Sequence, residues 1–257
     1  MATDKRGQAD AAGHGTGHGH GTGHGHGSGY GHHHRDVSGG WLRPAVFGAM
    51  DGLVTNVALI SGVGGGGGTA HTIVLTGLAG LAAGAFSMAA GEFVSVSSQN
   101  ELIQAEVNKE RHELEHNAAF EQAELAGMLR ARGVSAVTAR QAAAEISADP
   151  DKALAVHALE ELGVNPGDLP SPVVAAVASL ASFAVGALIP LIPYLVGLHL
   201  LWPALVLAAV AAVVGGGMVA RLTDRPFWKG ALRQLVLGAV AAGITYLIGI
   251  LVAHVIG

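Results

Sequence analysis

The sequence predicts an all-α membrane protein with five transmembrane helices and a helical insert between the second and the third. Hydrophobic residues make up 50% of the 257 residues and charged residues only 13%, whereas soluble domains carry roughly 25% charged residues. The hydrophobic residues gather in five stretches, each long enough for the ~20-residue helix that crosses a ~30 Å hydrocarbon core. These stretches lie at about 42–63, 72–98, 172–193, 199–220 and 230–256.

The polar residues mark the other parts of the chain. Residues 1–40 alternate Gly with His, and a segment with so few apolar side chains cannot offset its ordering entropy, so we expect a disordered tail. The histidines of this tail are His14, His18, His20, His24, His26, His32, His33 and His34. The predicted organisation is this tail, spans one and two within 41–98, a cytoplasmic metal-binding insert at 99–170 and spans three to five within 171–257.

Composition also excludes several functions. The chain has no Cys, which excludes disulfides, cysteine-bound zinc and thiol catalysis. Its net charge of −5 gives no reason to expect a nucleic-acid partner. Pro190 and Pro193 are expected to kink or end the third span, because proline cannot donate the helical hydrogen bond.

The basic residues predict the orientation in the membrane. All fourteen Lys and Arg lie before span one, in the insert, or around the connection between spans four and five. The positive-inside rule then places the N-terminus, the insert and that connection in the cytoplasm, and the C-terminus outside.

The insert carries a stripe of carboxylates. Residues 99–132 contain no Pro and only one Gly and are rich in helix formers, so we expect one continuous helix. At about 100° per residue, five glutamates share an arc of about 80°. Stacked like charges destabilise a helix, unless a divalent cation neutralises them. The alternative is a solvated acidic face, but no basic residues are interleaved and the stripe borders an apolar face. The five are Glu106, Glu110, Glu113, Glu121 and Glu124.

A second predicted helix, at about 152–162, could complete the site with His157, Glu160 and Glu161. Sites rich in carboxylates suit Mn²⁺, Mg²⁺, Ca²⁺ and Fe²⁺ more than zinc or copper.

Two carboxylates lie within the apolar stretches. Asp51 is well inside span one, and Glu92 follows Met88 by one turn in span two. A charge at mid-bilayer costs about 2.5–3.5 kcal/mol and should face a partner, a cavity or an ion path. Glu92 could instead be solvated at the boundary and Met88 could be ordinary packing, but no Lys or Arg lies inside a span to neutralise Asp51. A thioether beside carboxylates favours Fe²⁺ or Mn²⁺ over Mg²⁺ and Ca²⁺.

Small residues in spans one and two predict a close approach of these two helices. The glycines are Gly52, Gly62, Gly77, Gly80, Gly84 and Gly91.

The string "RHELEH" at 111–116 contains the H-E-x-x-H pattern of zinc metalloproteases. That chemistry needs a third ligand and a peptide cleft, yet Glu113 belongs to the glutamate stripe and the insert has no strand pattern. A ferritin-like oxidase would need two Glu-x-x-His pairs, and only Glu113 and His116 form one. We therefore expect no enzyme. A membrane-bound metal sensor or buffer without transport stays as the alternative to a transporter.

The segments "DGLVTNVALISGV", "GAFSMAAGEFVSVSSQNEL" and "HALEELGVNP", with the glutamate-rich insert between the last two, resemble the vacuolar iron transporter family. The resemblance runs from about Trp41 to the C-terminus. It implies five transmembrane helices, a cytoplasmic helical metal-binding domain and a homodimer. It further implies export of Fe²⁺ or Mn²⁺ from the cytosol by proton antiport.

The resemblance also implies roles for particular residues. Asp51, Met88 and Glu92 match the family's Asp, Met and Glu in the first two spans. Some members place Met and Glu where this chain has His157 and Ala158. The metal-binding glutamates of the family match Glu110, Glu113, Glu121, Glu124 and Glu161.

These predictions combine into one mechanism. The glutamate helices capture cytosolic Fe²⁺ or Mn²⁺, gathered first by the tail, and pass the ion to Glu92 and Met88 and then to Asp51. Protons from the outer side release it, and the path lies at a two-fold interface of spans one and two. The insert could also bind Zn²⁺, and the tail could be an inert linker or prefer zinc, nickel or copper. The membrane would be the cell membrane in a bacterium and the vacuolar membrane in a eukaryote.

Overall fold

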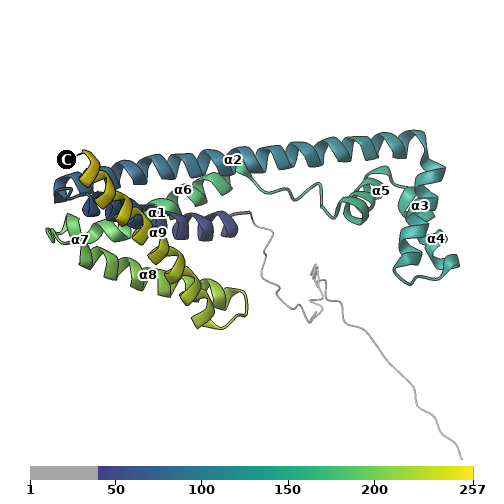
Figure 1. Ribbon diagram of the computed structural model, residues 1–257. Helices are drawn as coiled ribbons and strands as arrows, with labels where there is room; N and C mark the ends of the chain where they lie inside the picture. Colours follow the sequence, from purple (N-terminus) through teal and green to yellow (C-terminus); the bar gives the residue numbers. More distant parts are fainter. Residues whose placement is uncertain (1–39, 257) are drawn as a thin grey trace, which may run out of the picture. The chain divides into compact units, whose positions relative to one another are not determined.

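The computed structural model describes residues 40–256, which fold into helices joined by short connections, without a strand in this range (Figure 1). The helices of the membrane part are α1 (Leu42–Gly65), α2 (Ala70–His116), α6 (Pro172–Leu188), η2 (Ile189–Leu191), α7 (Ile192–Leu195), α8 (Leu201–Leu222) and α9 (Phe227–Ile256). The helices of the insert are the end of α2 together with α3 (Ala118–Ala131), α4 (Ala136–Ser147), α5 (Pro150–His157) and the π-helical η1 (Ala158–Leu162).

Five segments of the described chain are long and apolar enough to cross a membrane, which confirms the predicted fold class. They are Leu42–Gly65, Ala70–His116, Pro172–Leu195, Leu201–Leu222 and Phe227–Val255. Their outer surfaces carry large apolar side chains, including exposed Leu, Val and Ile along α9. These faces suit lipid, because lipid tails are as apolar as the side chains that meet them.

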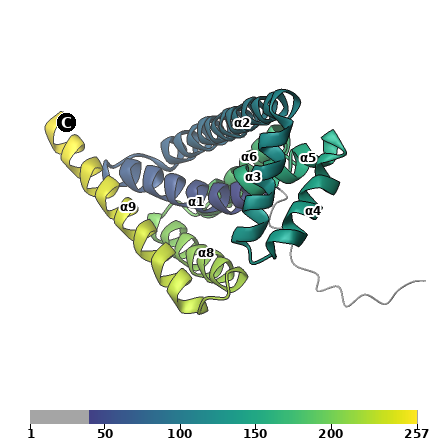
Figure 2. The same ribbon diagram turned by 90° about the vertical axis from the view of Figure 1, so that its right-hand side faces the viewer.

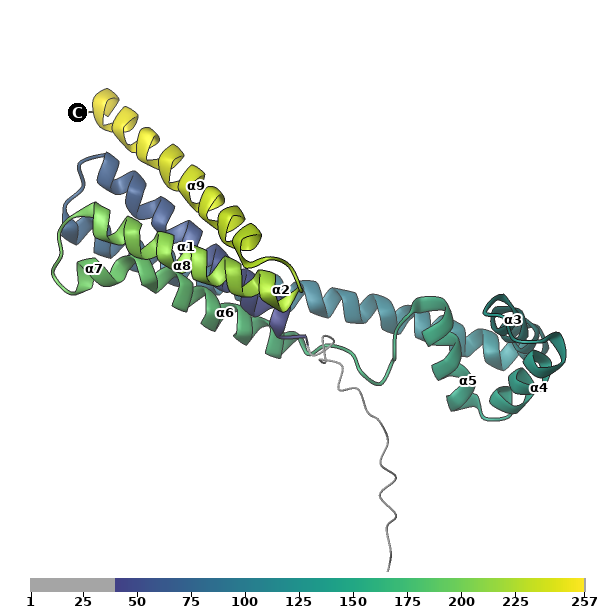
Figure 3. The same ribbon diagram turned by 90° about the horizontal axis from the view of Figure 1, so that it is seen from below.

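Helix α1 is the centre of the bundle. It contacts α2, α6, α8 and α9, and Figure 2 shows it between these helices. Helices α8 and α9 form a hairpin: they contact each other and diverge from their connection in Figure 3. Any polar side chain on α1 is therefore either packed among four helices or exposed on the one side that they leave open.

Glycines set the closest helix approaches, but mostly not between the helices that the sequence suggested. A Cβ at Gly52 would overlap the backbone of α6 at Phe183, and one at Gly186 would overlap the backbone of α1 at Ala49. Of the six predicted glycines, Gly80 is the one that contacts α1. The others face α6, Leu191 or α9, or, for Gly91, open space, so the expected glycine contact between spans one and two is wrong in most positions.

The third span is interrupted, as its prolines predict. Helix α6 ends at Leu188, and a 3₁₀ turn carrying Pro190 leads into the four-residue helix α7. The buried Asn56 of α1 donates a hydrogen bond from Nδ2 to the carbonyl oxygen of Ala187 at 2.5 Å. The Asn56 amide thus supplies a hydrogen-bond donor near Pro190, which has no backbone N–H to donate to the preceding turn.

In the insert, the predicted single helix over 99–132 is wrong. Helix α2 ends at His116, Asn117 has φ −126° and ψ 32°, and α3 begins at the next residue. The side chain of Asn117 donates to Glu113 Oε2 at 2.6 Å and stabilises the end of α2. The reversal lets Leu125 of α3 become fully buried against α4 and α5, and this tertiary packing outweighs the local helix propensity.

The close contact between α1 and α6 predicts the effect of adding one methyl group. We expect Gly186→Ala to lower the stability of the folded chain by about 1–3 kcal/mol, because the backbone of α1 must move away. Gly243→Ala is the matched control, since a Cβ at Gly243 meets nothing within 4 Å. Thermal unfolding of both variants in detergent measures the difference. Equal midpoints for the two variants would show that the α1–α6 contact does not constrain the bundle.

Candidate metal centre

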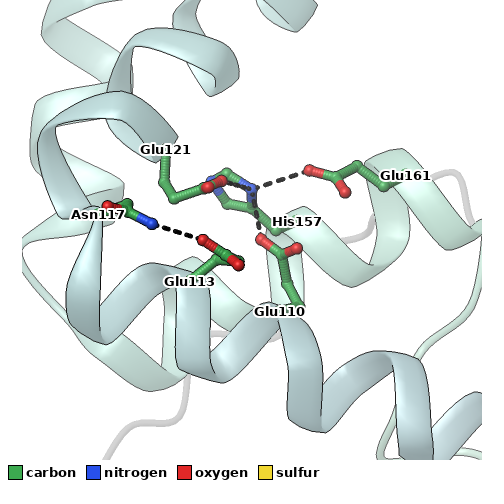
Figure 4. Close-up of polar contacts among 6 residues, drawn as sticks. All are labelled: Glu110, Glu113, Asn117, Glu121, His157 and Glu161. Carbon is green, nitrogen blue, oxygen red and sulfur yellow. Dashed lines mark hydrogen bonds and ion pairs between the residues drawn. The ribbon is translucent and has the colours of Figure 1, made fainter.

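Four predicted ligand residues meet in the insert (Figure 4). Glu110 comes from α2, Glu121 from α3, His157 from the end of α5 and Glu161 from η1. One possible ligand atom from each of the four lies within 4.8 Å of the others. The fold therefore brings together residues from four helical elements, which a helix over 99–132 could not have done.

Two local features of the sequence make this convergence possible. The reversal at Asn117 turns Glu121 back toward Glu110. After His157 the chain widens into a π-helix that ends at Gly163, whose φ of +67° favours glycine. This turn holds Glu161 Oε1 at 3.2 Å from His157 Nδ1. Isolated π-helical turns occur often at functional sites.

The oxygens converge on a single nitrogen. His157 Nδ1 lies 3.0 Å from Glu110 Oε1, 3.2 Å from Glu161 Oε1 and 3.7 Å from Glu121 Oε2. A ring nitrogen carries one hydrogen at most, so it can satisfy only one of the three carboxylates well. The His157 side chain is 0% exposed, and its Nε2 has no hydrogen-bond partner among the described residues. The arrangement has more acceptors than donors, and a cation would remove that imbalance.

Burial and mutual repulsion make Glu110 and Glu121 hard to ionise. Burial raises the pKa of Glu110, and the Glu161 charge raises it further, against a smaller lowering by His157. Burial likewise raises the pKa of Glu121, followed by the charge of Glu124, and His157 again lowers it. Burial is the larger cause of both shifts, and the neighbouring carboxylates add to it. A divalent cation bound among these oxygens would offset both effects.

The remaining predicted ligands of the insert divide into two groups. Glu113 and Glu124 lie near enough for their charges to raise the pKa of Glu121, although Glu113 already accepts the hydrogen bond from Asn117.

Glu106 and Glu160 lie outside the four-residue cluster. Glu106 is exposed, and Glu160 Oε2 pairs with Arg132 Nη2 at 2.7 Å. Two residues that the sequence did not single out thus hold predicted ligands in place: Asn117 holds Glu113, and Arg132 holds Glu160.

The H-E-x-x-H string does not form one site. Glu113 is directed toward Asn117 and the acidic cluster (Figure 4), whereas His112 and His116 form a separate exposed group with Glu115. A protease would need the first Glu beside metal-bound histidines, and this chain separates the two.

In the bundle, Asp51 is half-buried and its one hydrogen-bond partner among the described residues is Thr55 Oγ1, at 3.5 Å. It lies on the open side of α1, in line with the exposed Phe47 and Thr55. No hydrogen bond or ion pair of the described residues joins it to Glu92. Asp51 therefore stays without a cationic partner within the described chain.

The other two predicted pathway residues have different surroundings. Glu92 Oε2 is 3.3 Å from Arg43 Nη2, and the Glu92 side chain is 11% exposed against 79% for Arg43. The pair fastens the start of α1 to α2. Met88 packs against the cluster of Ala85, Phe183 and Ala187. The eight tail histidines lie outside the described residues.

Residues 42–250 match the model of the VIT family. The chain belongs to this family. It is 38% identical over 228 residues to the vacuolar iron transporter of Acanthamoeba castellanii, covering 85% of this chain and 82% of that protein. It is 36% identical over 211 residues to vacuolar iron transporter homolog 1 of Oryza sativa subsp. japonica, covering 80% and 71%. It is 34% identical over 216 residues to vacuolar iron transporter homolog 1 of Arabidopsis thaliana, covering 81% and 84%.

Membership confirms the resemblance found in the sequence and makes the chain a VIT family transporter rather than an enzyme. The protease and oxidase hypotheses are thereby set aside. The five apolar helices make it an integral membrane protein.

The raised pKa values predict a pH-dependent affinity for metal. Glu110 and Glu121 bind protons at a pH above their usual 4.5, and those protons compete with a metal for the same oxygens. We expect the affinity for Mn²⁺ to fall by about tenfold or more between about pH 7 and about pH 5. Titration calorimetry of the full chain at both values measures this. An unchanged affinity would contradict the assignment of these carboxylates as ligands.

Two adjacent glutamates give a matched pair of variants. Glu161→Gln should weaken Mn²⁺ binding by at least about tenfold, because it removes a converging oxygen. Glu160→Gln should leave the affinity unchanged, because it breaks only the ion pair with the mostly exposed Arg132. Such partly exposed pairs contribute about 0–1 kcal/mol. Equal losses in both variants would show that general acidity, and not this geometry, binds the ion.

Proposed function

We propose that the protein exports Fe²⁺ or Mn²⁺ from the cytosol by proton antiport, with the acidic cluster of the insert as the capture site. The observation that carries this proposal is the convergence of Glu110, Glu121 and Glu161 on His157 Nδ1. The names of the relatives, which are vacuolar iron transporters, support iron as cargo. The cluster of oxygens with one imidazole supports Fe²⁺ and Mn²⁺ together, because both accept mixed oxygen and nitrogen ligands.

Capture and transport are joined by one helix. α2 carries Glu110 in the insert and Glu92 in the bundle without interruption, and their separation of 18 positions corresponds to ~27 Å at 1.5 Å per residue. The ion released from the cluster then enters at Glu92, beside Met88, on the cytoplasmic side. The pairing of Glu92 with Arg43 makes it a gate, because an arriving cation must replace the guanidinium.

Asp51 is the next site along the path. A carboxylate that faces lipid costs about 2.5–3.5 kcal/mol, and Asp51 has no cationic partner in the described chain. A second copy of the chain placed on the open side of α1 would set two Asp51 carboxylates across a two-fold axis. The exposed face of α2 carries Ala79, Ala82, Ala83 and Ala90 together with the large apolar side chains of Leu75, Phe86 and Phe93, which suits an apolar contact between two copies.

Proton coupling follows from the same groups. Each carboxylate can hold either a proton or a share of the metal, so protons that arrive from the outer side displace the ion and are carried inward. The N-terminus and the insert are then cytoplasmic and the C-terminus is outside. In a eukaryote the membrane is that of the vacuole, and in a bacterium it is the cell membrane.

The tail has a supporting role in this proposal, which is to concentrate metal near the insert. Its histidines favour zinc, nickel and copper more than iron. Because the tail concentrates metal near the insert in this proposal, deletion of residues 1–40 should lower the transport rate at low metal concentration and leave the maximal transport rate unchanged.

Transport by this route predicts the behaviour of one aspartate variant. In proteoliposomes under a pH gradient, Asp51→Asn should reduce Mn²⁺ and Fe²⁺ flux at least about tenfold, because the amide cannot exchange a proton for metal. Asp151→Asn, at an exposed position on α5, is the control and should transport normally. Wild-type flux in Asp51→Asn would refute the path. Metal binding without flux in the wild-type protein would instead favour a membrane-bound buffer.

A further inference from the structure

Outside the acidic cluster, the last turn of α2 carries a second group of ligand side chains. Ligand atoms of His112, Glu115 and His116 lie within 4.8 Å of one another, and all three residues are exposed. We propose that these three residues form a separate binding site for a nitrogen-preferring divalent ion of the Zn²⁺, Ni²⁺ or Cu²⁺ class.

The two histidines are already arranged as a chelate. They are four residues apart and so lie one above the other on the helix, with ring centroids 3.9 Å apart and ring planes tilted by 35°. His116 Nδ1 lies 2.8 Å from the carbonyl oxygen of His112. A carbonyl can only accept, so Nδ1 is the donor. The Nε2 of His116 is therefore left with its lone pair free.

This hydrogen bond is the support that metal-binding histidines commonly have. A ligating imidazole usually donates its other N–H to a carbonyl or carboxylate, which fixes the tautomer and the orientation of the ring. In His116 that support comes from the helix itself. No rearrangement of the ring tautomer is then needed when a metal binds.

The surrounding charge favours a cation. Glu115 supplies a carboxylate within reach of both rings. The site also lies at the C-terminal end of a 47-residue helix, where the helix dipole is negative and stabilises positive charge. The three side chains leave coordination positions open to water, which suits a site that exchanges its ion readily.

The ligand set separates this site from the acidic cluster. The cluster offers three carboxylates and one imidazole, and the exposed group offers two imidazoles and one carboxylate. Imidazole-rich sites bind zinc, nickel and copper more strongly than manganese or ferrous iron, which stand lower in the affinity order. The chain can thus hold the two classes of metal at two different sites of the insert.

The bound ion would also stiffen the junction between α2 and α3. Its two imidazole ligands bracket Glu113, whose Oε2 accepts the hydrogen bond from Asn117. A metal that bridges residues 112 and 116 therefore resists fraying of the turn that orients Glu113.

The test uses the full chain with the eight tail histidines replaced by Ser, so that the tail does not compete for zinc. Zn²⁺ stoichiometry is measured by competition with a chromogenic chelator, and amide hydrogen exchange is followed in peptides that cover residues 108–118. The variants are His112→Gln with His116→Gln, and Glu161→Gln in the acidic cluster as the comparison.

We expect the double histidine variant to lose one equivalent of Zn²⁺, or to bind it at least about tenfold more weakly. Zn²⁺ should slow amide exchange at the end of α2 in the parent and not in that variant. Its unchanged Mn²⁺ affinity would show that the insert is still folded and that the acidic cluster is intact. Unchanged Zn²⁺ stoichiometry and exchange in the histidine variant would overturn the proposal, as would loss of all Zn²⁺ binding in Glu161→Gln.

Discussion

The insert is organised around a shortage of hydrogen-bond donors. Three carboxylates converge on His157 Nδ1, and that atom carries at most one hydrogen. Without a cation, this arrangement places like charges against one another, and burial with neighbouring charge raises the pKa values of Glu110 and Glu121. A divalent ion would replace the single proton and satisfy all three oxygens at once. The reversal at Asn117 and the π-helical turn after His157 are then understandable as the means of assembling a binding site. Such coupling would make the stability of the insert depend on metal.

Carboxylates of the bundle also lack firmly bound cationic partners within the described chain. Asp51 has a weak hydroxyl partner and no cation, while Glu92 has an arginine that is mostly exposed and therefore easily displaced. Within the described chain, Asp51 therefore has no partner of opposite charge, and Glu92 has one that solvent reaches. α2 connects the two regions, because it carries Glu110 of the acidic cluster near one end and Glu92 near its middle. In our account the protein moves an ion by offering it successive incomplete sites, each of which can alternatively take a proton.

The features that sequence predicted well are those fixed by composition and covalent geometry. Five spans follow from stretch length and hydropathy, and the interruption at Pro190 follows from the missing donor of proline. The break at Asn117 was missed because its neighbours are strong helix formers. The burial of Leu125 against other helices and the hydrogen bond from Asn117 to Glu113 favour the reversal. The predicted arrangement of the glutamates on one face of a continuous helix was therefore wrong as well. Glu106 and Glu160 lie apart from the cluster. Their spacing in the sequence does not indicate that Glu160 forms an ion pair with Arg132.

The most direct test of the central claim asks which atoms surround a bound ion. Electron spin echo envelope modulation of Mn²⁺, added below one equivalent to the full chain, detects nitrogen nuclei in its coordination shell. We predict the signal of one imidazole nitrogen, and its disappearance in His157→Gln. A Mn²⁺ spectrum without nitrogen coupling, or one that is unaffected by His157→Gln, would mean that the ion does not take the place of the proton on His157 Nδ1, and would contradict the account.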